Sequence, residues 1–260
     1  ALFPPHFIKE WYVGICERHT GDLVGFISAL PTSLHIGDKE FRRPSEIAVI
    51  NFLCVHKKYR KQMLAELLIR EITRRVNVSD IFQALYTSGN VLPTPFARAQ
   101  YFHRSLNVRK LLGIGFMEMK ASFRNFRNPV LMLERYYSLR ADGLPEYREM
   151  GPADVPAIRR LLNTYYRKNF AIAQQWETDA DVAHWFLPRP NVIYSYVIES
   201  QTKGSKSVSD FFSFYLLPSS LLHSSAGVLN AAYCYYFAST TKTQPELLQC
   251  ALLSAQELGF

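Results

Sequence analysis

Four basic side chains stand where an apolar strand pattern gives way to a helical one, and their type and spacing suit the binding of an anion. Lys57, Lys58, Arg60 and Lys61 directly follow the apolar segment 46–55. Backbone N–H groups at the start of a helix, together with the helix dipole, attract phosphate groups. The segment is therefore a candidate phosphate site, although from this local pattern alone a solvated basic helix start is the commoner explanation.

The elements that position these residues follow from the hydrophobic pattern. Segment 46–55 is nearly all apolar, as expected of a buried central strand. Apolar residues at helical spacing predict a helix from about 64 to 76, and 82–86 predicts the next strand. A hairpin over 11–16 and 23–30 precedes them. Strand, basic turn, helix and strand make a βαβ unit in a mixed sheet.

The second half of the sequence repeats this order of strands followed by a helix. Hydrophobic periodicity fades over 136–150, which predicts a linker. The last predicted helix opens with a capping box, Thr243 and Glu246, and Gly259 fits the position after its end. The remaining predicted elements are a helix over 151–165 and strands over 192–199, 210–217 and 231–237. We therefore expect two small α/β units, residues 1–140 and residues 141–260, with mixed sheets flanked by helices.

Composition narrows the class of protein. The 260 residues are 48% hydrophobic, enough for a sizeable core, which excludes disorder. Lys and Arg number 30 against 22 Asp and Glu, a net charge of +8 that residues 1–150 carry, because the remainder is balanced. An anionic ligand is therefore expected in the first part. A nucleic acid is the alternative, but the sequence contains no recognisable nucleic-acid-binding motif, so we expect none.

Cysteine usage and the apolar runs point to a protein of the cytoplasm. Four widely spaced cysteines form no Cys/His cluster, so we expect reduced thiols and no metal. The most apolar run, 211–222, contains Pro218 and three serines, and therefore predicts no transmembrane segment. We expect a cytoplasmic monomer.

Longer strings of sequence carry a specific resemblance. Residues 60–65 roughly fit the R/Q-x-x-G-x-G/A pattern of GNAT acyltransferases, with Met63 where Gly is usual. Over nearly its whole length the chain resembles the protein N-myristoyltransferase family. The strings that carry this resemblance are NFLCVHKK (51–58), LIREITRRV (68–76), FQALYT (82–87), VLPTP (91–95), YFHRSLN (101–107), HWFLP (184–188), DFFSFYLLPS (210–219) and AAYCYY (231–236).

The resemblance implies a fold and a reaction. The fold would be α/β, two GNAT-like acyltransferase units related by a pseudo-twofold axis. The reaction would transfer a myristoyl group from myristoyl-CoA, as co-substrate, to the N-terminal glycine amine of protein substrates, without a prosthetic group or metal. Alternatives are a catalytically weak or inactive remnant that binds acyl-CoA or peptide, and another GNAT-type acyltransferase such as an acetyltransferase.

The resemblance also assigns residues, in three groups. The backbone N–H groups of Phe52 and Leu53 would form the oxyanion hole. Acyl-CoA would contact Leu53, Cys54, Val55, Arg60, Lys61, Gln62, Met63, Leu64 and Ala65. The substrate peptide would contact Asn51, Thr87, Tyr101, His103, Tyr215 and Tyr233, of which His103 is our first choice. Taken without the resemblance, a lone His or Tyr is more often structural.

The family's chains extend beyond the matched strings at both ends. The resemblance implies that the general base for the glycine ammonium is the carboxylate at the C-terminus of that longer chain. We therefore expect a family member truncated at both ends, and loss of a general base typically lowers a rate by a factor on the order of 10²–10⁴.

Overall fold

The computed structural model describes residues 3–37, 47–202, 205–220 and 228–260. Glu46, where the third predicted strand was expected to begin, lies outside the described residues. The chain forms two compact units that are interleaved along the sequence. Unit 1 comprises Ala1–Arg98 and Tyr166–Trp185, and unit 2 comprises Ala99–Tyr165 and Phe186–Phe260.

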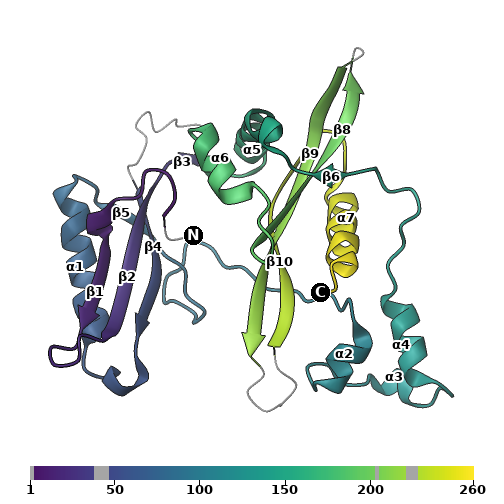
Figure 1. The fold of residues 1–260 in the computed structure, drawn as a ribbon, viewed down its shortest axis with the longest axis horizontal. Helices are drawn as coiled ribbons and strands as arrows, with labels where there is room; N and C mark the ends of the chain where they lie inside the picture. The colour runs from purple at the N-terminus through teal and green to yellow at the C-terminus, as the bar shows by residue number, and fades with distance from the viewer. Residues whose placement is uncertain (1–2, 38–46, 203–204, 221–227) are drawn as a thin grey trace. The chain divides into compact units, whose positions relative to one another are not determined.

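Unit 1 is built on a four-stranded mixed sheet (Figure 1). Its strands β1, β2 and β4 pair antiparallel, whereas β5 runs parallel to β4. The bounds are β1 (Tyr12–Cys16), β2 (Leu23–Thr32), β4 (Ile47–Val55) and β5 (Gln83–Leu85), in the spatial order β1-β2-β4-β5. The predicted hairpin and central strand are thereby confirmed.

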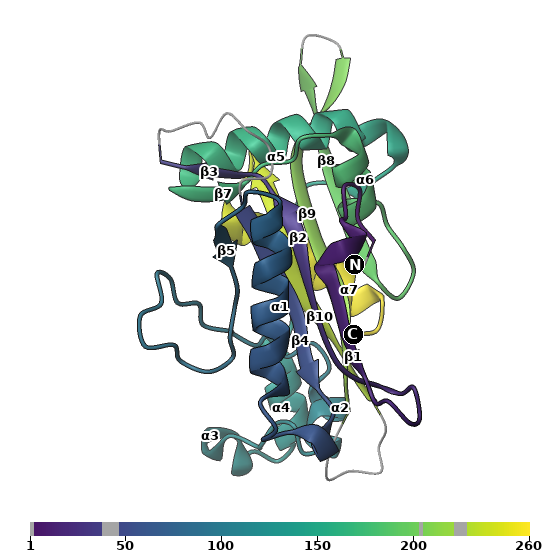
Figure 2. The same ribbon diagram turned by 90° about the vertical axis from the view of Figure 1, so that its left-hand side faces the viewer.

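Helix α1 (Leu64–Val78) covers one face of this sheet (Figure 2). Leu68, Ile72 and Val76 recur every four residues, so they lie on one face of the helix and are buried. They form a core cluster with sheet residues that include Trp11 and Ile27. Each fully buried side chain of this kind contributes roughly 1.5–3 kcal/mol, which fixes α1 and therefore the loop that precedes it.

The smaller elements of unit 1 were not predicted from the sequence. They are η1 (Lys9–Trp11), β3 (Leu34–Ile36), η2 (Lys57–Tyr59), β7 (Ile172–Gln174) and α6 (Asp179–Phe186), whose last residue belongs to unit 2. Strands β3 and β7 pair antiparallel although more than 130 residues separate them. Local sequence patterns cannot reveal a pairing of this kind.

Unit 2 contains a four-stranded sheet whose strands all pair antiparallel. The strands are β6 (Arg148–Glu149), β8 (Ile193–Thr202), β9 (Ser205–Ser220) and β10 (Val228–Ser239), in the order β10-β9-β8-β6. Helix α7 (Gln244–Glu257) packs Leu247 and Cys250 against Phe212 and Phe214. The predicted capping box is present: Thr243 accepts a hydrogen bond from the Glu246 N–H, and the Glu246 carboxylate accepts one from the Thr243 N–H.

The other helices of unit 2 belong to its first sequence segment. They are α2 (Val108–Gly113), α3 (Ala121–Arg124), α4 (Pro129–Tyr137), η3 (Pro152–Asp154) and α5 (Val155–Asn169), the last of which crosses the boundary between the units. The α/β class is confirmed. The division of the sequence after residue 140 stays a prediction, since the compact units follow a different partition in which residues 99–140 belong to unit 2.

The structure also bears on the cysteines and on membrane-spanning helices. All four cysteines are free thiols. Within the part of the chain that the structure describes, every helix is too short or too polar to cross a bilayer.

Candidate functional site

Strand β4 leaves its ladder at the two residues predicted to form the oxyanion hole. Cys54 pairs with Phe26 and Asn51 pairs with Ser28, so Phe52 and Leu53 together oppose the single residue Ile27. This two-against-one arrangement is a β-bulge. The parallel pairing with β5 ends earlier, at Val49, so neither ladder includes Phe52 or Leu53.

The bulge is strained and reaches the surface. Phe52 has φ +58°, in the left-handed region that a residue with a Cβ avoids at a cost of about 1–2 kcal/mol. Its side chain and that of Leu53 are 52% and 44% exposed, although both belong to a central strand. Strain of this kind persists where the surrounding fold imposes it and is often found at functional sites. The bulge can therefore present backbone donors to a ligand.

The basic loop between β4 and α1 begins after Val55, two residues beyond the bulge. Arg60 donates from Nε to the Val55 carbonyl at 3.3 Å, which holds its guanidinium at the end of the strand. Lys57, Lys58, Arg60 and Lys61 belong to the eight residues between Val55 and Leu64, the first residue of α1. The N–H groups of the first turn and these cations make this an electropositive helix start that can bind phosphate groups.

Two residues of this loop adopt left-handed backbone conformations. Lys61 has φ +67° and Met63, which caps α1, has φ +59°. The second value explains why the acyltransferase pattern places Gly at that position, since Gly alone adopts this conformation without a steric cost. The loop conformation is therefore present here even though the glycine is not.

The acidic residues near the loop are engaged with partners. Glu66, in the first turn of α1, forms an i,i+4 ion pair with Arg70. Glu17 accepts a hydrogen bond from the Tyr59 hydroxyl and raises the pKa of that phenol. The negative charge that Glu66 brings to the loop is thus shared with a cation of its own helix.

Two of the residues predicted to contact the peptide belong to unit 1, in or just after the paired strands β4 and β5. Asn51 follows the last parallel-paired residue of β4, Val49, by two positions, and Thr87 follows Leu85 of β5 by the same offset. Because the strands are parallel, both residues lie the same distance beyond the paired segment, Asn51 within β4 and Thr87 after the end of β5. The Asn51 carbonyl accepts a hydrogen bond from the Ser28 hydroxyl.

Three predicted peptide residues form an aromatic group in unit 2. Tyr215 and Tyr233 are cross-strand partners in β9 and β10 whose rings stack with centroids 5.5 Å apart. Tyr101 meets Tyr233 edge to face at 6.0 Å. Burial, and then the neighbouring Tyr101 and Tyr233, raise the pKa of Tyr215, so its hydroxyl remains a donor at neutral pH. The structure thus brings together residues that are more than 130 positions apart.

His103 lies on the other face of that sheet. It lines a cavity of about 540 Å³ together with Phe214 and Cys234, the cross-strand pair next to Tyr215 and Tyr233. Side chains alternate between the two faces of a strand, so this cavity and the tyrosine group are on opposite faces. The His103 ring meets Phe116 edge to face at 6.2 Å. The structure does not group it with the three tyrosines.

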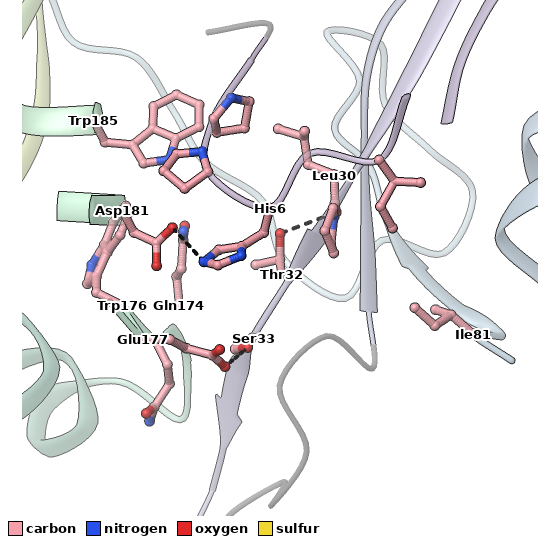
Figure 3. A pocket seen from close by; sticks show the side chains of 15 residues that line it. His6, Leu30, Thr32, Ser33, Ile81, Gln174, Trp176, Glu177, Asp181 and Trp185 are labelled. Atoms are coloured by element: carbon pink, nitrogen blue, oxygen red, sulfur yellow. Dashed lines mark hydrogen bonds and ion pairs between the residues drawn. The ribbon is translucent and has the colours of Figure 1, made fainter. Parts of the chain in front are cut away.

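A second cavity, in unit 1, is lined mostly by residues that the sequence did not single out (Figure 3). Its volume is about 340 Å³, and the Asp181 carboxylate points toward His6, with 3.9 Å between Oδ1 and Nε2. Trp176 and Trp185 contribute aromatic walls. These residues come from segments far apart in the sequence, and of those named here Trp185 alone belongs to a quoted string, so only the folded chain brings them together.

Comparisons with known proteins show the family to which the chain belongs. The profile described as "Myristoyl-CoA:protein N-myristoyltransferase, N-terminal domain" matches residues 1–99, and the profile of the C-terminal domain of the same family matches residues 114–260. The chain is 40% identical over 261 aligned positions to glycylpeptide N-tetradecanoyltransferase 1 of Arabidopsis thaliana and 41% identical to glycylpeptide N-tetradecanoyltransferase 2 of Bos taurus. All of this chain is covered in both alignments, against 57% and 50% of those relatives.

A solved structure is also similar. The crystal structure of Saccharomyces cerevisiae N-myristoyltransferase with bound myristoyl-CoA superposes with a TM-score of 0.84 at 32% sequence identity. The similarity covers 98% of this chain and 60% of that one. The chain therefore spans between half and two thirds of the length of these relatives.

Proposed function

Because the chain belongs to the protein N-myristoyltransferase family, we propose that it transfers a myristoyl group from myristoyl-CoA to the N-terminal glycine amine of protein substrates. The observation that carries the proposal is the β4 bulge at Phe52 and Leu53, next to an electropositive helix start. Acyl transfer from an acyl-CoA uses both features: a pair of donors for the thioester carbonyl oxygen, and a site for the phosphates of CoA.

The reaction assigns a role to each part of this site. The glycine nitrogen attacks the thioester carbon, and the carbonyl oxygen becomes negatively charged in the tetrahedral intermediate. Backbone N–H groups of Phe52 and Leu53 stabilise that charge, an effect that typically amounts to a factor of 10²–10³ in rate for each donor. The nitrogen then loses a proton, the C–S bond breaks, and CoA leaves as a thiolate that takes up a proton, so that the products are the amide and the CoA thiol.

The loop after the bulge would hold the CoA portion of the co-substrate. Phosphate groups would lie against the N–H groups of the first turn of α1 and the side chains of Arg60 and Lys61, while the backbone of residues 53–55 would line the pantetheine. The left-handed Met63 shapes the loop without the glycine of the pattern. Backbone donors do not depend on side-chain identity, so the contacts at residues 60–65 tolerate the differences from that pattern.

Polar and aromatic residues predicted to contact the peptide occur in each unit, and we assign their contacts unit by unit. We assign the peptide contacts to Asn51 and Thr87 in unit 1 and to the group Tyr101, Tyr215 and Tyr233 in unit 2, and we keep His103 as a separate contact. Tyrosine rings can wall an extended peptide, and their hydroxyls can form hydrogen bonds with its backbone. A monomeric state and a cytoplasmic location complete the proposal.

A single-turnover assay tests the function. The chain, in excess over myristoyl-CoA, is mixed with a peptide that begins with Gly, and the acylated peptide is followed by mass spectrometry while the released CoA thiol is titrated. We expect one acylated peptide for each thiol released, and no acylation of a matched peptide whose first residue is alanine.

Two other outcomes would replace the proposal. Binding of myristoyl-CoA without transfer would identify a remnant that binds acyl-CoA but does not catalyse. Faster transfer from acetyl-CoA than from myristoyl-CoA would identify a different GNAT-type acyltransferase.

A further inference from the structure

Most of the net charge of the chain lies outside the CoA loop, in the segment that forms α2, α3 and α4. Residues 104–140 contain eight basic and two acidic side chains, a net charge of +6 out of +8 for the whole chain. The basic residues are Arg104, Arg109, Lys110, Lys120, Arg124, Arg127, Arg135 and Arg140, and we call them the α2–α4 basic surface. The three short helices form one group within unit 2 (Figure 1).

These cations are available to an external partner. All eight residues are exposed. Among the described residues, Arg109 is the one of the eight that forms an ion pair, with Glu134. A concentration of positive charge that the fold does not neutralise raises the local concentration of polyanions.

Aromatic side chains lie among the cations. Phe116, Phe126 and Tyr136 are 52%, 47% and 60% exposed. Phe123 joins Phe126 and Tyr136 in one cluster, with ring centroids 6.0 and 5.5 Å apart. Exposed rings interleaved with Lys and Arg are typical of proteins that lie at a membrane interface, where rings enter the headgroup layer and cations meet phosphate groups.

Two of the cations lie directly over rings. The Lys120 ammonium is 4.5 Å from the ring centroid of Tyr136, and the Arg104 guanidinium is 5.1 Å from that of Tyr137. Single-stranded nucleic acids bind mainly by stacking bases on open ring faces. Here each of these two tyrosines has a cation over its ring, which disfavours base stacking and leaves the cations at the surface.

We propose that the α2–α4 basic surface binds the surface of a bilayer that contains anionic phospholipids. The cations contact lipid phosphates and carboxylates, and Phe116 and Phe126 enter the headgroup layer. This surface is distinct from the β4 bulge and the CoA loop, and the proposal does not depend on the function proposed above.

Co-sedimentation of the full chain with vesicles tests this proposal. We expect binding to phosphatidylcholine vesicles that contain phosphatidylserine, little binding to pure phosphatidylcholine, and a loss of binding as salt is added. The double variant Arg124→Glu/Arg127→Glu should weaken binding by about tenfold or more, because each basic residue near an anionic surface contributes roughly a factor of five. Phe126→Ser should weaken binding by a smaller factor, because it removes one apolar contact.

A matched control separates this surface from net charge. Lys9→Glu/Arg18→Glu changes the charge of the chain by the same amount, at exposed residues of unit 1. Vesicle binding by this variant should stay within about twofold of the unmodified chain. Circular dichroism checks that all three variants fold.

Three results would overturn the proposal. One is equal loss of binding in the two charge-reversal variants. Another is equal binding to both kinds of vesicle. The third is tighter binding of a single-stranded RNA oligomer than of phosphatidylserine vesicles at the same salt concentration, which would make the partner a nucleic acid.

Discussion

The two units each contain a bulge in the strand that precedes the sheet-covering helix, and the two bulges differ in how they are completed. In β4 of unit 1, Phe52 and Leu53 oppose Ile27, whose apolar side chain cannot form hydrogen bonds. In β10 of unit 2, Tyr235 and Tyr236 oppose Ser213. The Ser213 hydroxyl accepts from the Tyr236 N–H at 3.1 Å and donates to the Tyr236 carbonyl at 2.9 Å. The backbone N–H and C=O groups of Tyr236 in the second bulge are therefore hydrogen-bonded within their own sheet.

The connection between β10 and α7 is likewise hydrogen-bonded within its own unit, whereas the connection between β4 and α1 is exposed and basic. After β10, the N–H groups of Thr240, Thr241 and Lys242 all donate to the carboxylate of Asp210, which is fully buried. After β4, the corresponding connection carries four cations, and its two left-handed residues are exposed. Unit 2 thus contains its own anion at the position where unit 1 can take a phosphate group from a ligand.

This difference supports the proposal that unit 1, and not unit 2, binds the charged acyl donor. The strand-bulge-helix arrangement alone provides donors, but donors become a binding site only where the fold leaves them without an internal acceptor. Unit 1 has an apolar residue opposite its bulge and an open connection, whereas unit 2 has a serine and an aspartate. The following predictions test this distinction, from the largest expected effect to the smallest.

Replacing Leu53 by proline should have the largest effect. Leu53→Pro removes one N–H group at the bulge, and the single-turnover rate of acyl transfer should fall by about 10²–10³. Leu53→Ala is the matched control, because it removes the side chain but keeps the donor, and its rate should stay within a few fold. Equal rates in the two variants, with folding and acyl-CoA binding intact, would remove Leu53 from the oxyanion hole.

The internal anion of unit 2 should be important for stability. Asp210→Asn places an amide among several donors, and because hydrogen bonds to charged groups are each worth roughly 1.5–3 kcal/mol, we expect a loss of about 3 kcal/mol. Urea denaturation measures it. Asp142→Asn, at an exposed position of the same unit, is the control and should change stability by less than about 0.5 kcal/mol.

Asp210 should also make the free energy of unfolding depend on pH in the acid range. Burial alone would raise the pKa of Asp210, but hydrogen bonds from Ser209, Ser239 and Thr241 outweigh burial and hold the pKa below its ordinary value of 3.8. The carboxylate therefore contributes fully above that ordinary value, and its contribution is lost as pH falls through the lowered pKa of the folded state. As the pH is lowered below about 4, the free energy of unfolding should fall less in Asp210→Asn than in the unmodified chain. An equal fall in both proteins would contradict the role given to Asp210.

Opening the bulge of unit 2 should destabilise it without affecting the chemistry. Ser213→Ala leaves the N–H and C=O groups of Tyr236 without the serine hydroxyl, which should cost about 1–3 kcal/mol. Ser195 pairs with Ser213 in the β8–β9 ladder and is also buried, but its hydroxyl has no hydrogen-bond partner within the described residues. Ser195→Ala should therefore be neutral or stabilising in thermal denaturation, and similar losses in both variants would show that the hydroxyl of Ser213 has no special role.

The smallest expected effect is at the cap of α1. Met63→Gly relieves a left-handed conformation that costs about 1–2 kcal/mol, and part of this gain is offset by the greater entropy of glycine in the unfolded chain. We expect a net stabilisation of about 0.5–1 kcal/mol and acyl-CoA affinity at least equal to that of the unmodified chain. Gln62→Gly, at a neighbouring residue whose φ is not positive, should be destabilising instead.

Much of the fold could be predicted from local patterns. The apolar run that became β4, the helical spacing of Leu68, Ile72 and Val76, and the capping box at Thr243 each correspond to the element that the structure contains. The pairing of β3 with β7 and the cavity around His6 and Asp181 could not be predicted, because they join segments far apart in the sequence. The strings of family sequence named the candidate site residues, but not their arrangement, in which His103 lies on the face opposite to Tyr215 and Tyr233.

The sequence by itself determined where the strands and helices form, where the positive charge is concentrated, and to which family the chain is similar, since these depend on residue types and short-range spacing. Only the tertiary structure decided which backbone groups remain open. That outcome depends on register: Ile27 opposite Phe52 and Leu53, Ser213 opposite Tyr236, and Asp210 some thirty residues before the N–H groups that it binds. A hydrogen bond is satisfied or left open by whichever atom lies within about 3 Å, and the long-range pairing of strands decides which atom that is.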